Sequence, residues 1–152
     1  MKKNPFEQLF KQGIKISFVK LDPYAIEPEK GYDGDAAFDL FAFEKVVIPP
    51  HTMQLVEVGI AVECPSFICW TLRSRGSQHT NGILIYPGMG DPGYRGDIGV
   101  NIHNTTNHSA TYRRGDRIGQ IQFMIRLNVK LQETTQIADS PRGKKGFGST
   151  DR

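Results

Sequence analysis

The sequence is poor in cysteine and has no long apolar run. Cys64 and Cys69 are the only cysteines among 152 residues, and no His-Cys cluster with zinc-ligand spacing accompanies them. We expect both to be buried, reduced thiols, because cytosolic chains rarely keep disulfides. No apolar stretch approaches the about 20 residues needed to cross a bilayer, and no apolar segment follows Lys2 and Lys3. We therefore expect no membrane association, no secretory signal, and a cytoplasmic protein (in the host cytoplasm if viral).

The chain also lacks a strong charge bias. Its net charge is +3 and its pI is about 8.9, which suits an anionic small molecule as well as a nucleic acid. No basic stripe or aromatic ladder appears, so we expect no nucleic-acid partner. The four histidines show no metal-binding spacing, and the one tryptophan, Trp70, is expected in the core.

What is present is a succession of short runs with a period of two. Pro and Gly pairs such as Pro49-Pro50 and Pro87-Gly88 separate them. Such spacing predicts an all-β fold, an antiparallel sandwich or barrel. One short helix is expected at the N-terminus, where Asn4 can cap it and Gly13 can end it. Strands are expected in Ile14–Val19, Thr52–Glu63, Phe67–Leu72, Gly82–Tyr86, Asp97–Ile102 and Arg117–Arg126.

The C-terminal stretch 142–151 concentrates residues that suit a nucleotide. Ser149, Thr150 and the backbone amides freed by glycines could surround phosphate oxygens, with Arg142 supplying charge. Phe147 offers a face on which a base could stack. The simpler alternative is a solvated tail. We interpret 1–139 as one β domain (1–13 as the probable helix) and 140–152 as a flexible Gly-rich arm.

The segment Gly90–Gly96 contains a second combination of chemically useful groups. Asp91 held in a cleft could accept a proton from water, and Tyr94 could pack against a sugar. The alternative is turn chemistry alone, because Asp, Pro and Gly favour turns for backbone reasons.

Three further places in the sequence suit a phosphate ligand and its counter-cation. The run from Arg73 to Ser77 provides forked donors, hydroxyls and free amides for a phosphate, or else is a solvated loop. Gln120 interrupts an apolar strand and needs partners if it faces inward. Asp39 is the one carboxylate of 33–39 that we expect to approach a cation, through water.

These segments, in this order, resemble the trimeric dUTPases, the deoxyuridine triphosphate nucleotidohydrolases. Five blocks carry the resemblance: Asp35–Ala42, Arg73–Ser77, Gly90–Gly96, Gly115–Phe123 and Arg142–Asp151. It implies a jelly-roll-like β fold, a homotrimer with shared active sites, and Mg²⁺-dependent hydrolysis of dUTP to dUMP and pyrophosphate.

The resemblance also implies residue roles. Asp91 takes the place of the water-activating carboxylate, Tyr94 that of the ring under deoxyribose, and Phe147 that of the ring stacked on uracil. Mg²⁺ is expected to bind mainly through substrate phosphates and water, with Asp39 in its outer shell. The expected substrate-binding residues are Arg73, Ser74, Arg75, Gly76, Gly88, Tyr94, Gln120, Arg142, Phe147, Gly148, Ser149 and Thr150.

The chain departs from the family pattern at several positions. Arg75 stands where the second block usually has Ser or Gly, and Gly90 stands where the third usually has Ile. Tyr86 and Pro87 replace small residues or Asn near the expected uracil site.

Two rival functions share features with this sequence. A dCTP deaminase shares the fold and often has Asp-Pro-Gly-Tyr, as in residues 91–94, but needs a glutamate in the following strand. The matching stretch is Gly99-Val100-Asn101, and no glutamate lies between Glu63 and Glu133. The second rival is a non-catalytic module that senses nucleotide or binds a partner protein.

Overall fold

The structure is a computed structural model that describes residues 13–144, and within them nearly all regular structure is antiparallel β. One short helix, α2 (Gly76–Thr80), interrupts the strands. It does not have the length or the apolar character that a membrane-crossing helix needs. The strands are β1 (Ser17–Lys20), β2 (Phe38–Phe41), β3 (Val46–Ile48), β4 (Met53–Glu57), β5 (Ile60–Glu63), β6 (Ile68–Arg73), β7 (Ile83–Ile85), β8 (Met89–Gly90), β9 (Gly99–Asn104), β10 (Ala110–Tyr112) and β11 (Arg117–Ile125).

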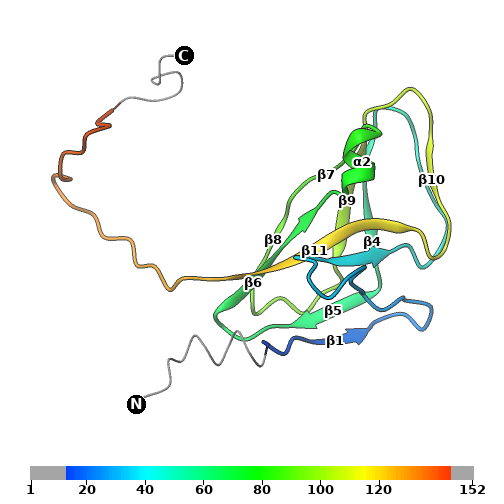
Figure 1. Cartoon of the computed structure of the whole chain (residues 1–152), viewed down its shortest axis with the longest axis horizontal. Helices are drawn as coiled ribbons and strands as arrows, with labels where there is room; N and C mark the ends of the chain where they lie inside the picture. The colour runs from blue at the N-terminus through cyan, green and yellow to red at the C-terminus, as the bar shows by residue number, and fades with distance from the viewer. Residues whose placement is uncertain (1–12, 145–152) are drawn as a thin grey trace.

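The strands form four small antiparallel sheets (Figure 1). The largest has the order β2-β11-β6-β8, and another has the order β4-β9-β7. The pairs β1-β5 and β10-β3 complete the set. Because neighbours such as β2 and β11 are distant in sequence, the large sheet brings together segments that sequence order separates.

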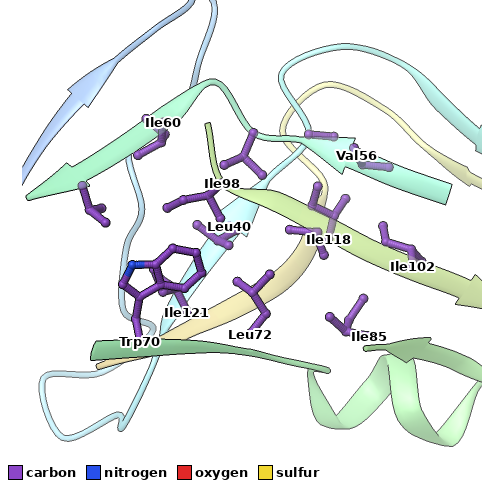
Figure 2. Packing of buried hydrophobic residues seen from close by; sticks show 14 of the residues in the cluster. Leu40, Val56, Ile60, Trp70, Leu72, Ile85, Ile98, Ile102, Ile118 and Ile121 are labelled. Atoms are coloured by element: carbon purple, nitrogen blue, oxygen red, sulfur yellow. The ribbon is translucent and has the colours of Figure 1, made fainter. Parts of the chain in front are cut away.

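Branched aliphatic side chains fill the space between the sheets (Figure 2). In β9 the alternation is plain, since Val100 and Ile102 are fully buried while the residues between them are half-exposed. Ile98 just before β9 and Ile118 in β11 are also fully buried. This period-two burial is the signal that predicted an all-β fold.

One predicted strand is in fact two. The run Thr52–Glu63 divides into β4 and β5 because Gly59 lies between them with φ +69°. A residue in this left-handed region cannot continue a strand, and glycine adopts it without steric cost. The sequence analysis also missed β2, β3, β8, β10 and α2, while the predicted N-terminal helix lies outside the described residues except for Gly13.

Both cysteines are buried and free, as expected. Burial raises the pKa of the Cys64 thiol above its ordinary value of 9.0, against the lowering effect of the nearby Arg95. The thiol therefore stays protonated and unreactive near neutral pH.

Beyond β11 the chain runs away from the body as an extended segment (Figure 1). Its apolar side chains are almost fully exposed, as with Leu131 at 98% and Ile137 at 84%. A domain boundary at residue 139 remains a prediction.

Gly59 gives a direct test of the corner between β4 and β5. A Cβ at this position would come 2.9 Å from the Cβ of Ala25, and the left-handed φ disfavours any side chain. We expect Gly59→Ala to lower the free energy of unfolding by about 1–3 kcal/mol in a denaturant titration. Gly34→Ala is the control, because a Cβ there would meet nothing within 4 Å. Equal losses in both variants would contradict this account of the corner.

Candidate functional site

A cavity of about 280 Å³ opens beside the turn that follows β8. The turn contributes Asp91 and Tyr94, while β6 contributes Trp70 and Leu72. The predicted pair Asp91 and Tyr94 therefore does face a common space. The remaining lining residues are Leu55, Glu57, Gly88, Met89, Gly90, Asp97 and Gly99.

Hydrogen bonds close the turn and attach it to the body. The Tyr94 amide donates to the Asp91 carbonyl at 3.1 Å, and the Tyr94 hydroxyl donates to the Asp97 carbonyl at 2.8 Å. The Asp97 carboxylate in turn accepts from the Gly59 amide at 2.9 Å and the Ile60 amide at 3.2 Å. These bonds hold the loop 91–97 at a fixed position against the start of β5. The backbone that carries the Asp91 carboxylate is therefore rigid.

The sequence analysis missed two carboxylates of this cavity. Glu57 comes from β4, where it lies opposite Gly99 of β9, and Asp97 ends the turn. No local motif marks Glu57, because only strand pairing brings it there. The cavity therefore has one glutamate, although it does not lie in the strand that a deaminase would require.

Ser74, directly after β6, is hydrogen-bonded to the end of β7. Its Oγ accepts a hydrogen bond from the Ile85 amide at 2.8 Å. The hydroxyl proton is then left to donate elsewhere. Neighbouring Arg73 is exposed and lies opposite Gln120 in the ladder between β6 and β11.

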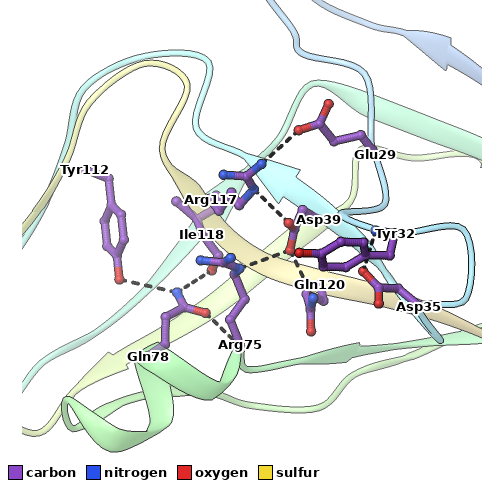
Figure 3. Close-up of polar contacts among 10 residues, drawn as sticks. All are labelled: Glu29, Tyr32, Asp35, Asp39, Arg75, Gln78, Tyr112, Arg117, Ile118 and Gln120. Carbon is purple, nitrogen blue, oxygen red and sulfur yellow. Dashed lines mark hydrogen bonds and ion pairs between the residues drawn. The ribbon is translucent and has the colours of Figure 1, made fainter.

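Asp39 is the centre of a polar network (Figure 3). Its carboxylate is almost buried, and Oδ1 accepts from Arg75 Nε and Gln120 Nε2, each at 3.0 Å. Oδ2 pairs with Arg117 Nε at 2.7 Å, and Arg117 also contacts Glu29 at 3.0 Å. Gln120 therefore faces inward with a protein partner, and one acid fixes two guanidinium groups and an amide.

A buried glutamine of α2 holds the backbone of Arg75 in place. Gln78 Oε1 accepts from the Arg75 amide at 3.0 Å, while its Nε2 donates to the Ile118 carbonyl at 3.0 Å. The segment expected to be a phosphate loop thus begins a helix at Gly76, and Arg75 immediately precedes it.

A second, more polar cavity of about 420 Å³ lies beside this network. Arg75 and Arg117 line it together with Ser77 and Gln78. It shares no lining residue with the cavity of Asp91. The structure thus brings Asp91, Tyr94 and Gly88 to one place, and Arg75 and Gln120, through Asp39, to another.

The predicted arm residues are only partly covered. Arg142 is exposed in the extended segment, with an interaction of its own. Phe147, Gly148, Ser149 and Thr150 lie outside the described residues.

Residues 13–144 contain no group of three or more His, Cys, Asp or Glu side chains that could hold a metal ion. Asp39 uses both oxygens for cationic or amide donors. Any Mg²⁺ at this site would therefore have to come with ligands of its own, such as phosphate oxygens and water.

One cavity combines apolar side chains with the carboxylate of Asp91, and the other is lined by arginines that a buried acid holds. This pair suits a ligand with a ring at one end and negative charge at the other. Comparison with known proteins agrees. The family model described as dUTPase matches residues 23–151. The deoxyuridine 5'-triphosphate nucleotidohydrolase of Crocosphaera subtropica is 38% identical over 140 residues, which span 90% of this chain and 99% of that protein.

Two solved structures show the same architecture. The Staphylococcus bacteriophage 80alpha dUTPase with dUpNHpp superimposes with a TM-score of 0.84 at 25% identity, over 89% of this chain and 97% of that one. A dUTPase from phage phi11 of S. aureus, with a structural Mg(II) ion, has a TM-score of 0.77 at 21% identity, over 82% and 99% of the two chains. The chain belongs to the dUTPase family, and the predicted all-β, jelly-roll-like class is confirmed.

The Asp39 network can be tested by removing its charge. Asp39→Asn keeps the size of the side chain but cannot pair with both arginines, so we expect the free energy of unfolding to fall by about 1–3 kcal/mol. The arginine side chains are 32% and 41% exposed, and solvent screening keeps the loss below that of a fully buried pair. The comparison is Glu29→Gln, which removes only an exposed pair and should cost about 0–1 kcal/mol. If both variants unfold at the same urea concentration, Asp39 is not the centre of the network.

Proposed function

We propose that this protein hydrolyses dUTP to dUMP and pyrophosphate. The observation that carries the proposal is the placement of Asp91 and Tyr94, from one rigid turn, on the wall of one cavity in a chain of the dUTPase family. The carboxylate supplies a base, and the ring supplies a surface for the sugar.

The nucleoside part is assigned to this cavity. Deoxyribose packs on the face of Tyr94, where a 2′-hydroxyl would not fit. Uracil lies against the backbone of the loop between β7 and β8 near Gly88, whose carbonyl already accepts from the Leu72 amide at 3.4 Å. Backbone groups can recognise the edge of a base without a dedicated side chain.

Asp91 then activates the attacking water. The carboxylate takes a proton as the water oxygen bonds to the α-phosphorus, and the bond from that phosphorus to the oxygen bridging the α- and β-phosphates breaks. Pyrophosphate departs with the electron pair of that bond, and dUMP carries the new oxygen.

The triphosphate is assigned to the end of β6 and to the Asp39 network. The donors there come from Arg73, Ser74, Arg75 and the Gly76 amide. Asp39 orients Gln120 by accepting a hydrogen bond from its side-chain amide. Mg²⁺, carried by the phosphates, would supply charge neutralisation there, with Asp39 and Gln120 nearest to its water shell.

A homotrimer accounts for the separation of the two cavities. The nucleoside cavity and the arginine-lined cavity share no lining residue, and in the proposed trimer the arginine-lined cavity of one copy lies against the nucleoside cavity of a neighbour. The exposed apolar segment after β11 supports this, because Leu127, Val129 and Leu131 alternate as a strand does and are 73%, 68% and 98% exposed. The arm, with Arg142, Phe147, Ser149 and Thr150, closes over the nucleotide in the cytoplasmic enzyme.

Replacing Asp91 tests the chemistry. Asp91→Asn should lower kcat for dUTP by about 10²–10⁴-fold, because the amide cannot take the proton, while binding of a non-hydrolysable dUTP analogue persists. Asp33→Asn, in an exposed loop, is the matched control and should leave kcat unchanged. Normal turnover by Asp91→Asn would remove Asp91 from this role.

The same assay distinguishes dUTP hydrolysis from dCTP deamination when pyrophosphate and ammonia are measured separately. Release of ammonia from dCTP, without pyrophosphate from dUTP, would identify a deaminase and overturn the proposal.

Truncation after Ser140 tests the arm. The shortened chain should fold with an unchanged denaturation midpoint, since the removed residues come after the strands and the core. Its kcat/KM for dUTP should fall at least about tenfold, because the lid and its cations are gone. Full activity in the truncated protein would show that the arm is a passive tail.

A further inference from the structure

The indole of Trp70 occupies the space that a side chain at residue 90 would need. Trp70 in β6 and Gly90 in β8 are direct partners in the sheet. A Cβ at Gly90 would lie 1.8 Å from Trp70 Cε2, far inside any real contact distance. Glycine is therefore required at this position by the ring opposite it, and Asp91 follows directly in sequence.

The same indole supports Tyr94. The two ring centroids are 6.2 Å apart at an interplanar angle of 60°, an edge-to-face contact. On its other sides Tyr94 is tied through its hydroxyl to the Asp97 carbonyl and lies over Gly96, where a Cβ would come 2.4 Å from Tyr94 Oη. Tyr94 is 46% exposed, so few side chains hold its ring, and the buried indole of Trp70 is one of them.

Trp70 is itself immobilised by packing. It is 5% exposed and stands up from β6 among the aliphatic side chains of the core (Figure 2). Its Nε1–H is buried without a hydrogen-bond partner within residues 13–144, so shape and not polar bonding orients the ring.

We propose that Trp70 is a positioning residue that fixes the face of Tyr94 and thereby sets discrimination between deoxyribose and ribose nucleotides. The inference rests on the proposed function, in which deoxyribose packs on Tyr94. A Tyr94 ring that can tilt or recede leaves room for a 2′-hydroxyl, so the loss of Trp70 admits UTP.

The test is the ratio of kcat/KM for dUTP to kcat/KM for UTP, measured with Mg²⁺ on the full chain. Trp70→Leu fills much of the core volume but removes the ring, and it should lower the ratio at least about tenfold. Trp70→Phe retains a ring under Tyr94 and lacks the unpartnered donor, so its ratio should stay within about threefold of the wild type. Ile68→Ala is the matched control: Ile68 is buried on the same face of β6 but does not line the cavity, so this variant loses stability and keeps the ratio.

An unchanged ratio in a folded Trp70→Leu variant would overturn the inference while leaving the proposed function intact. Absence of dUTP hydrolysis in the wild type would instead overturn the proposed function. If Trp70→Leu does not fold, Gly90→Ala displaces the indole from the opposite side and should lower the ratio in the same way; an unchanged ratio there also overturns the inference.

A spectroscopic measurement gives an independent outcome, because Trp70 is the chain's one tryptophan. Saturating the wild type with dUpNHpp should change the intensity or wavelength of its emission, since the ligand would lie against Tyr94 in the cavity that Trp70 lines. If the emission does not change at saturation, although calorimetry verifies binding, the nucleotide does not lie against Tyr94 in the cavity that Trp70 lines.

Discussion

The buried carboxylate of Asp39 is the interaction on which the polar half of the site depends. A single acid on β2 accepts from Arg75, Arg117 and Gln120, which come from the end of β6 and from β11. Removing an acid from water is costly unless its oxygens find hydrogen-bond donors, and here three donors meet two oxygens. The same bonds that compensate for burial also fix the direction of the donors around the second cavity.

The cavity of Asp91 and Tyr94 is built on a different principle. Asp91 and Tyr94 are exposed, and their positions come from backbone bonds within the turn, from the carboxylate of Asp97 and from packing against Trp70. Such a turn can expose the proton-accepting carboxylate of Asp91 to water while the Trp70 indole that supports the turn remains buried. The cavity of Arg75 and Arg117 therefore relies on buried charge pairing, and the cavity of Asp91 relies on shape.

How much the sequence could predict depends on the range of the interactions. Period-two patterns predicted the class of fold and most central strands, because burial of alternate residues is a local signal. Asp91 and Tyr94 could be placed together because they belong to one turn. Gln120 and Asp39 could be singled out, but their direct bond depends on the pairing of β2 with β11 across about eighty residues of chain. Glu57 and the Trp70-Gly90 contact were missed for the same reason, since only sheet register creates them. The split at Gly59 was missed because an apolar run conceals a change of φ.

The balance of charge in the Asp39 network explains why the rest of the chain has to take part in binding a triphosphate. Arg75 and Arg117 are matched by Asp39 and Glu29, so the network has no net charge despite its two guanidinium groups. It can orient phosphate oxygens by directed donors, but it cannot by itself neutralise a ligand with several negative charges. In the function proposed above, the further cations are Arg73 beside the network, Arg142 of the arm, and the Mg²⁺ that the phosphates would bring. Closing of the arm, as proposed above, would supply part of this missing positive charge.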